Sequence, residues 1–245
     1  MPTTIAVVAG LSVYPVKSMA GSAIQKAYVG LNGILGDRRY SFVRAEQASR
    51  NSFPWMTVRE CTDMLLYKPE FAHPPSPDQQ EPPVRVRTPE GGVLDVSDPV
   101  LCEQLGRKLG HAVFLLNSAT GIFDAQHLSL FSLASLRGLV EEAGCAIDRR
   151  QFRANLYLEP VSGEAYEEET WTGCILQIGD EAIVGVTKRD TRCMMVNVDP
   201  DNAKQNSQVL KAVVRSHNGQ AGLYGNVVRR GWIREGDPVR LVSKY

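Results

Sequence analysis

Cys193 is the residue of this chain whose type and neighbours are best suited to chemistry. It ends the run KRDTRC at positions 188–193, in which arginines precede the thiol in sequence. A positive environment favours the thiolate, which is the form of cysteine that binds metals and attacks electrophiles. The other four cysteines have apolar or ordinary neighbours, so we expect Cys193 to be the reactive one.

Three basic clusters, far apart in sequence, have the residue types needed to complete a site around that thiol. They are YPVKS at 14–18, GDRRY at 36–40 and QFRANL at 151–156. Arginine offers a planar fork for phosphate oxygens and lysine a point charge, while Ser18 and Asn155 add neutral hydrogen bonds. If the clusters converge on Cys193, they form a site for a phosphorylated cofactor whose metal takes the thiolate.

Each of these features alone also has a purely structural explanation. A single Arg at a strand edge is more often a solvated surface residue, and a single Cys is usually a small buried hydrophobe. A cysteine-nucleophile enzyme with His217 or His127 as base is a further alternative, because such a cysteine needs an oriented base. The four histidines lie in no recognisable partner motif, and we therefore favour the cofactor interpretation.

Composition limits the class of protein. The 245 residues balance 27 Lys+Arg against 27 Asp+Glu, which argues against a general nucleic-acid binder. The five cysteines are odd in number, widely spaced and without a CxxC pair, so we expect neither a zinc or iron–sulfur site built from several cysteines nor a disulfide framework. No stretch is apolar enough to span a membrane and the first residues do not resemble a signal peptide, which predicts a reduced, cytoplasmic protein.

Short strands dominate the expected secondary structure. Helices are predicted at 97–110, opened by an N-cap residue and a proline, at 132–140 with a stop near Gly144, and in a short piece at 207–212. The proline-rich segment 73–83 is a loop. Many short strands with few helices predict a mainly β protein, a barrel or sandwich rather than a βαβ fold. Strands are expected at 5–14, 23–29, 40–43, 64–67, 84–88, 156–158, 174–178, 182–186, 194–198 and 238–242.

The order of motifs along nearly the whole chain resembles the MOSC family, named for the C-terminal domain of molybdenum cofactor sulfurase, with the N-terminal β-barrel domain that often precedes it. This resemblance implies a smaller N-terminal β-domain over residues 1–120 and a MOSC β-barrel over 121–245, with the cofactor site at their junction. Besides the three basic clusters, the matching segments are TVR at 57–59, TW at 170–171, RC at 192–193, VDP at 198–200, LYG at 223–225 and GDPV at 236–239.

The resemblance also implies roles for individual residues. It makes Cys193 the ligand of a molybdenum ion carried by a pterin, and the helix-start motif FSLASL at 131–136 a further contact with that cofactor. The residues that the resemblance assigns to the pterin and its phosphate are Lys17, Ser18, Arg38, Arg59, Ser132, Ser135, Arg153 and Asn155.

Similar proteins include amidoxime-reducing enzymes and bacterial hydroxylaminopurine-detoxifying proteins, so the resemblance implies an oxidoreductase that reduces small N-hydroxylated molecules. A soft thiolate suits molybdenum, and the cofactor carries out the redox chemistry. Some relatives have a C-terminal ferredoxin domain, whose cluster-binding cysteines are absent after position 193 here. We therefore expect a separate electron-donor protein, and the alternative is a non-catalytic module that carries the cofactor or its sulfur.

Overall fold

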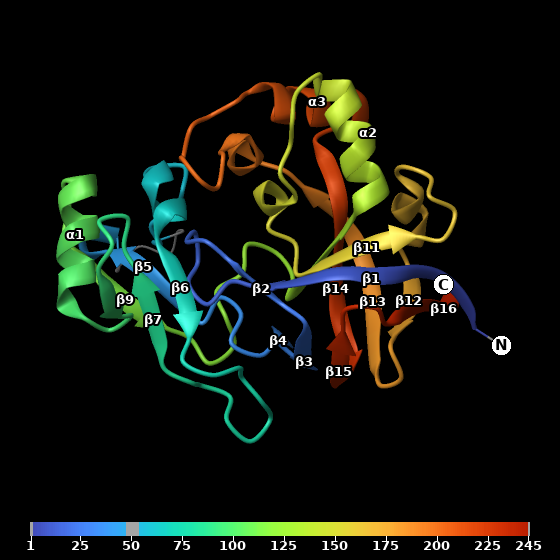
Figure 1. Ribbon diagram of the computed structural model, residues 1–245, viewed down its shortest axis with the longest axis horizontal. Coiled ribbons are helices and arrows are strands. Elements are labelled where there is room, and N and C mark those ends of the chain that lie inside the picture. The colour runs from blue at the N-terminus through green and yellow to red at the C-terminus, as the bar shows by residue number, and fades with distance from the viewer. Residues whose placement is uncertain (1, 48–53, 245) are drawn as a thin grey trace.

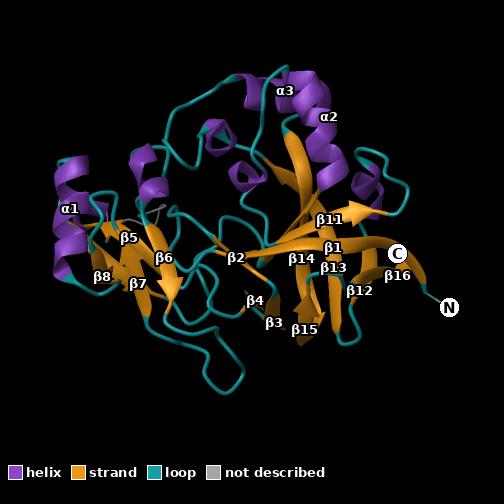
Figure 2. Cartoon of the chain, viewed as in Figure 1, coloured by secondary structure: helices purple, strands orange, loops and turns teal. Residues whose placement is uncertain are grey.

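The computed structural model describes residues 2–47 and 54–244 of the chain. Strands dominate these residues, which confirms the expected mainly β fold. A barrel with α2 and α3 above it occupies one side of the molecule, and α1 with the strands from β5 to β9 lies at the other (Figure 1). Colouring by secondary structure makes the long loops between these two parts visible (Figure 2).

The described residues contain the following elements. The helices are α1 (Pro99–Leu109), α2 (Leu133–Ala143) and α3 (Gln208–His217), with 3-10 turns η1 (Ala45–Gln47), η2 (Thr62–Leu66), η3 (Arg149–Phe152), η4 (Glu167–Trp171) and η5 (Met194–Asn197). The strands are β1 (Thr3–Val13), β2 (Ser22–Ile24), β3 (Lys26–Gly30), β4 (Gly33–Ile34), β5 (Tyr40–Arg44), β6 (Lys68–Phe71), β7 (Val84–Arg87), β8 (Val93–Asp95), β9 (Val113–Asn117), β10 (Leu128–Ser132), β11 (Leu156–Pro160), β12 (Cys174–Ile178), β13 (Ala182–Thr191), β14 (Gln220–Arg229), β15 (Gly231–Arg234) and β16 (Pro238–Lys244).

Seven strands close a barrel within the described residues. Their order is β11-β10-β14-β13-β12-β16-β1, and β1 pairs back with β11, so the sheet has no free edge there. The pairings are antiparallel except β10 with β11, which is parallel. The barrel therefore takes its strand β1 from the start of the chain, well before residue 120. The boundary at residue 120 stays a prediction.

The N-terminal part has its own core. Strands β5 and β9 pair with each other, β6, β7 and β8 form a second sheet, and α1 packs against β9. Phe42, Tyr67 and Leu105 are fully buried in this core. Val198 and Ala203, from the segment after Cys193, are buried in the same core. The segment that carries the candidate thiol is therefore anchored in the opposite part of the molecule.

Two of the expected helices form because both ends are capped. Asp98 begins α1 by accepting a hydrogen bond from the Val100 backbone N–H at 2.9 Å, and Ser132 caps α2 in the same way. Each helix ends at a glycine with left-handed backbone, Gly110 for α1 and Gly144 for α2. None of the helices in the described residues is long and apolar enough to cross a membrane.

Two expected strands were wrong. Residues 64–67 and 194–198 fall mainly in the 3-10 turns η2 and η5. A short apolar run buries its side chains equally well in a tight turn, so periodicity does not separate the two conformations. At 194–198 the chain must turn, because Val198 enters the N-terminal core whereas Val196 enters the core beneath α2 and α3. Strands β10 and β14, which the sequence did not predict, complete the barrel.

The barrel core generates a stability prediction. Leu176 on β12 is fully buried, whereas Val228 on β14 is 58% exposed. Replacing Leu176 by Ala removes buried methyl groups and leaves a cavity, so L176A should lower the free energy of unfolding by about 2–5 kcal/mol. The matched variant V228A should change it by no more than about 0.5 kcal/mol in urea unfolding. Equal effects in the two variants would contradict the assigned barrel interior.

Candidate functional site

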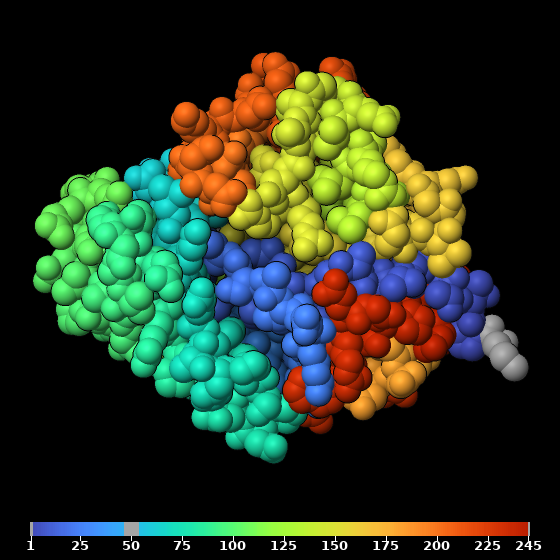
Figure 3. Space-filling view, in the orientation of Figure 1, coloured from blue at the N-terminus to red at the C-terminus, as the bar shows by residue number. Residues whose placement is uncertain are grey.

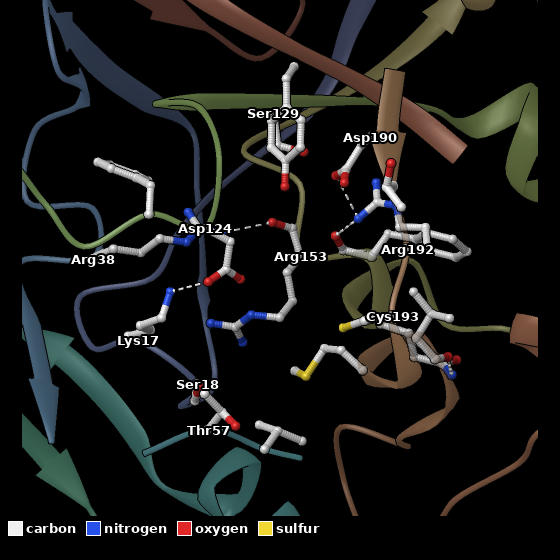
Figure 4. A pocket seen from close by; sticks show the side chains of 18 of the residues that line it. Lys17, Ser18, Arg38, Thr57, Asp124, Ser129, Arg153, Asp190, Arg192 and Cys193 are labelled. Atoms are coloured by element: carbon white, nitrogen blue, oxygen red, sulfur yellow. Dashed lines mark hydrogen bonds and ion pairs between the residues drawn. The ribbon is translucent and has the colours of Figure 1, made fainter. Parts of the chain in front are cut away.

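One pocket brings together seven of the nine residues that the sequence predicts for the site. It has a cavity volume of about 170 Å³ and lies where the barrel meets the N-terminal part. The lining side chains are shown in Figure 4, in which the Cys193 sulfur points across the cavity toward Arg153 and Lys17. The seven residues are Lys17, Ser18, Arg38, Arg59, Arg153, Asn155 and Cys193.

Cys193 reaches the pocket because a strand ends immediately before it. Strand β13 runs to Thr191, and Cys193 is the extended residue that precedes the turn η5. Its backbone carbonyl accepts a hydrogen bond from the Val196 N–H at 3.3 Å, which closes this turn. The side chain is half-buried, so the thiol is held at the pocket wall while one side remains accessible.

The carboxylate of Asp37 joins the basic clusters to one another. It is buried, accepts a hydrogen bond from the Tyr14 backbone N–H at 2.7 Å and one from the Asn155 amide at 3.0 Å, and forms an ion pair with Arg38. Asn155 also accepts from the Ser129 backbone N–H at 3.2 Å. The clusters at 14–18, 36–40 and 151–156 are therefore fixed by two adjacent buried side chains.

Three pocket residues have an unusual backbone conformation. Ser18, Arg38 and Arg153 have φ values of 68°, 51° and 51°, in the left-handed region that non-glycine residues rarely adopt. The described residues contain only three other such positions, Tyr166, Ala203 and Asn218, and none of these lines the pocket. Residues in this region carry strain of order ~1 kcal/mol each and gather at functional sites, which fits the placement of this pocket.

Burial weakens the positive charge of two pocket cations. Burial lowers the pKa of Lys17, although its ammonium forms an ion pair of 2.7 Å with Asp124 and donates to the Ile122 carbonyl. Burial, reinforced by the neighbouring guanidinium of Arg38, lowers the pKa of Arg153 to about 10. Burial thus disfavours the charged form of both groups, and a bound anion would offset that cost.

The cations around the pocket outnumber the carboxylates that pair with them. Arg38 pairs with Asp37, Lys17 with Asp124, and Arg192 with Asp190 at 2.9 Å. Arg59 and Arg153 form no ion pair within residues 2–47 and 54–244. Arg153 instead donates to the Met19 carbonyl at 2.6 Å. The surplus of two positive charges would favour a bound anion.

Two buried polar atoms of the pocket lining have no hydrogen-bond partner in the described part of the chain. They are the hydroxyl oxygen of Ser129 and the Nη2 atom of Arg192, whose other nitrogens donate to the Ala221 and Phe152 carbonyls. An unpaired buried donor costs about 1–3 kcal/mol, so both atoms favour a ligand that accepts hydrogen bonds. Together with the thiol, they fit an anionic cofactor that carries a metal.

Ser132 and Ser135 do not line this pocket. The Ser132 hydroxyl accepts from the Ser135 backbone N–H at 3.3 Å. The Ser135 hydroxyl donates to Glu168 at 2.7 Å and accepts from the Tyr166 backbone N–H. Both side chains are buried and are used to start α2 and to hold η4 against it. They contact no pocket surface.

The histidines also lie elsewhere. His217 forms an ion pair with Glu142 at 2.9 Å and packs on the Tyr166 ring, and His127 packs edge-on against Phe123. Neither of these two histidines lines the pocket. Neither histidine is therefore placed to act as the base of a cysteine nucleophile in this pocket.

Several pocket residues were not predicted as site residues, among them Asp190, Arg192, Asp124 and Ser129. Asp190 and Arg192 lie in the run that ends at Cys193, so their position was a usable signal. Burial raises the pKa of the Asp190 carboxyl despite its ion pair with Arg192. Asp124 and Ser129 lie in no basic cluster, and only the path of β10 and the loop before it brings them to the pocket.

Comparison with known proteins agrees with this architecture. Residues 117–240 match the MOSC domain, and residues 5–95 match the MOSC N-terminal beta barrel domain. The chain belongs to the MOSC domain family. MOSC domains are associated with the molybdenum cofactor.

Two of the solved structures that match the chain are similar to it to different extents. The YuaD protein from Bacillus subtilis shares the fold over the whole of both chains, with 16% identity and a TM-score of 0.54. YiiM from Geobacillus stearothermophilus matches 48% of this chain and 54% of its own, with 21% identity and a TM-score of 0.38. No curated protein matches the chain.

The Asp37 ion pair generates a second stability prediction. Replacing Asp37 by Ala leaves the Arg38 guanidinium without its buried counter-charge, so D37A should lower the free energy of unfolding by about 3–5 kcal/mol. The matched variant E159A removes the partner of the exposed residue Arg137 and should cost less than about 1 kcal/mol. Urea unfolding measures both values. A D37A cost as small as that of E159A would show that Asp37 does not hold the clusters together.

Proposed function

We propose that this protein binds the molybdenum-pterin cofactor and reduces small N-hydroxylated compounds, hydroxylaminopurines to the corresponding amines and amidoximes to the corresponding amidines. The observation that carries the proposal is the single pocket in which the Cys193 thiol faces Lys17, Arg38 and Arg153. Membership of the MOSC domain family supports it, because these domains are associated with that cofactor.

The pocket residues would hold different parts of the cofactor. Cys193 would hold the metal, since a soft thiolate is a preferred ligand of such ions. Arg59 and Arg153, which have no carboxylate partner in the described residues, would hold the anionic phosphate. The Ser129 hydroxyl and Arg192 Nη2 would donate to the cofactor the hydrogen bonds for which they have no acceptor in the described residues.

When bound, the cofactor supplies the two-electron, oxygen-atom chemistry of the reaction. The balanced change is R–NHOH + 2e⁻ + 2H⁺ → R–NH₂ + H₂O, in which the N–O bond breaks and the oxygen leaves as water. The two electrons come from a separate electron-donor protein. The chain's own residues hold and orient the reacting groups, because enzymes of this kind leave the redox step to the cofactor.

The metal-binding role of Cys193 is testable by composition. Protein made in a host that synthesises the cofactor should contain molybdenum and pterin, and C193A should lose molybdenum at least ~10-fold, since the ligand itself is removed. Mass spectrometry of the metal and pterin fluorescence after oxidation measure both components. C61A is the matched control, because Cys61 is also a half-buried free thiol but lies outside the pocket. Equal molybdenum in C193A and C61A would refute the assignment.

Turnover separates a reductase from a cofactor or sulfur carrier. Molybdenum-loaded protein, supplied with a chemical reductant or a reductase, should convert a hydroxylaminopurine to the aminopurine or benzamidoxime to benzamidine. The rate should vanish in C193A and persist in C61A. Loaded, folded protein that converts neither substrate would contradict the reductase and favour the carrier.

A further inference from the structure

A second, larger cavity shares Arg153 with the candidate cofactor pocket. Its volume is about 730 Å³, within the range of small-molecule sites. Its walls come from the end of β1 and the turn to β2, from η2 and β6, and from α2 and η3. Figure 3 shows this face of the molecule, where the blue N-terminal residues lie between the cyan region of β6 and the yellow region of η3. We call this cavity the Arg149 groove.

Basic side chains exceed acidic ones in the Arg149 groove. Lys68, Arg149, Arg150 and Arg153 line it, against Glu70 and Asp148. The positive charge of Arg150 is neutralised by its two ion pairs, with Asp148 at 2.7 Å and with Asp201 at 2.6 Å.

Arg149 is a cation without a counter-charge. It is half-buried and forms no ion pair within the described residues. Its guanidinium lies over the Tyr157 ring at 4.9 Å and against β1 at Gly10, where a Cβ atom would approach Nη1 to 2.9 Å. Ring and backbone therefore hold the guanidinium in place before any ligand binds, which lowers the entropic cost of binding an anion. Lys68 also forms no ion pair in this part of the chain and is exposed.

The remaining lining suits the uncharged part of a ligand. Leu136 supplies partly exposed apolar surface and Ser22 a partly exposed hydroxyl group, whereas Tyr14, Leu65 and Ser12 are almost fully buried in the wall. The guanidinium groups of Arg153 and Arg38 lie 4.3 Å and 4.7 Å from the centre of the Tyr14 ring, which fixes the orientation of the ring. A cavity of this volume, with some apolar surface and a hydroxyl group beside fixed cations, suits a molecule that joins an uncharged group to a phosphate.

We propose that the Arg149 groove binds a phosphate-bearing ligand of nucleotide size, with the phosphate at Arg149 and Lys68. Two sources share this chemistry. One is a free nucleotide, which binds whether or not the protein holds molybdenum. The other is a nucleotide joined to the pterin cofactor and passing Arg153, and this source rests on the function proposed above.

The first experiment tests the free nucleotide. GMP, AMP and CMP are titrated calorimetrically into full-length protein from a host that lacks the cofactor, with guanosine as the uncharged control. At least one nucleotide should bind, and guanosine at least ~10-fold more weakly, because guanosine lacks the phosphate that accepts charge-assisted hydrogen bonds. R149A and K68A should each weaken nucleotide binding by a similar factor. R137A should not, because Arg137 is exposed, pairs with Glu159 and lies outside the groove.

The second experiment tests the cofactor-borne nucleotide. Protein from a cofactor-making host is treated with acid, and released nucleotide is counted against molybdenum by mass spectrometry. A nucleotide present in proportion to molybdenum, and lost in R149A while molybdenum is retained, supports the proposal through this source. Binding only in the titration supports it through the free nucleotide. No nucleotide in either experiment, or equal nucleotide binding by R149A and R137A, overturns the proposal that the Arg149 groove binds a nucleotide. The proposed function is tested separately, by the loss of molybdenum in C193A.

Discussion

The buried carboxylate of Asp37 is the interaction on which the geometry of the site depends. Its two oxygens accept hydrogen bonds from Tyr14 and Asn155 and pair with Arg38, which are residues separated by up to 141 positions in sequence. A buried carboxylate is costly unless its hydrogen-bonding capacity is filled, so the protein must bring all three partners to it at once. The basic clusters therefore converge because the buried Asp37 carboxylate needs a hydrogen-bonding or charged partner from each of them.

That convergence has an electrostatic and conformational cost. Lys17, Arg38 and Arg153 are held near one another, and Arg38 and Arg153 also adopt the left-handed backbone. Like charges and strained residues both raise the free energy of the folded state, and a fold retains them where the surroundings determine their position. An anion in the pocket relieves the charge repulsion. The arrangement that raises the free energy of the folded protein without a ligand therefore favours binding of an anion.

Local patterns in the sequence predicted the mainly β class and several of the individual elements. Helices α1 and α2 were predicted because leucine spacing and capping residues are short-range signals, and strand β12 was predicted with its full range. The turn at 194–197 was not, because its apolar residues are divided between two cores that only the folded chain defines. Barrel closure by β1 is likewise a long-range pairing, between residues about 150 positions apart.

The candidate site likewise contains residues that can be recognised from the local sequence and residues whose role depends on the fold. The basic residues and Cys193 could be found because their types are informative on their own. Asp124 and Ser129 could not, because an acid or a hydroxyl acquires its role only from what lies opposite it. Ser132 and Ser135 show the converse, since a motif at a helix start is fully explained by capping and by the contact with Glu168.

The position of Cys193 depends on both the barrel and the N-terminal part. Ligand binding at Cys193 is therefore coupled to the packing of these two parts against each other. The strand before it, β13, belongs to the barrel, whereas Val198 and Ala203 after it are buried in the N-terminal core. Asn197, which lies between Cys193 and Val198, accepts a hydrogen bond from the Leu210 N–H at 2.8 Å, and this bond also holds the segment against α3. A ligand that joins Cys193 to Lys17 therefore bridges the two cores. Because it binds only when they are packed together, it must stabilise their packing by mass action.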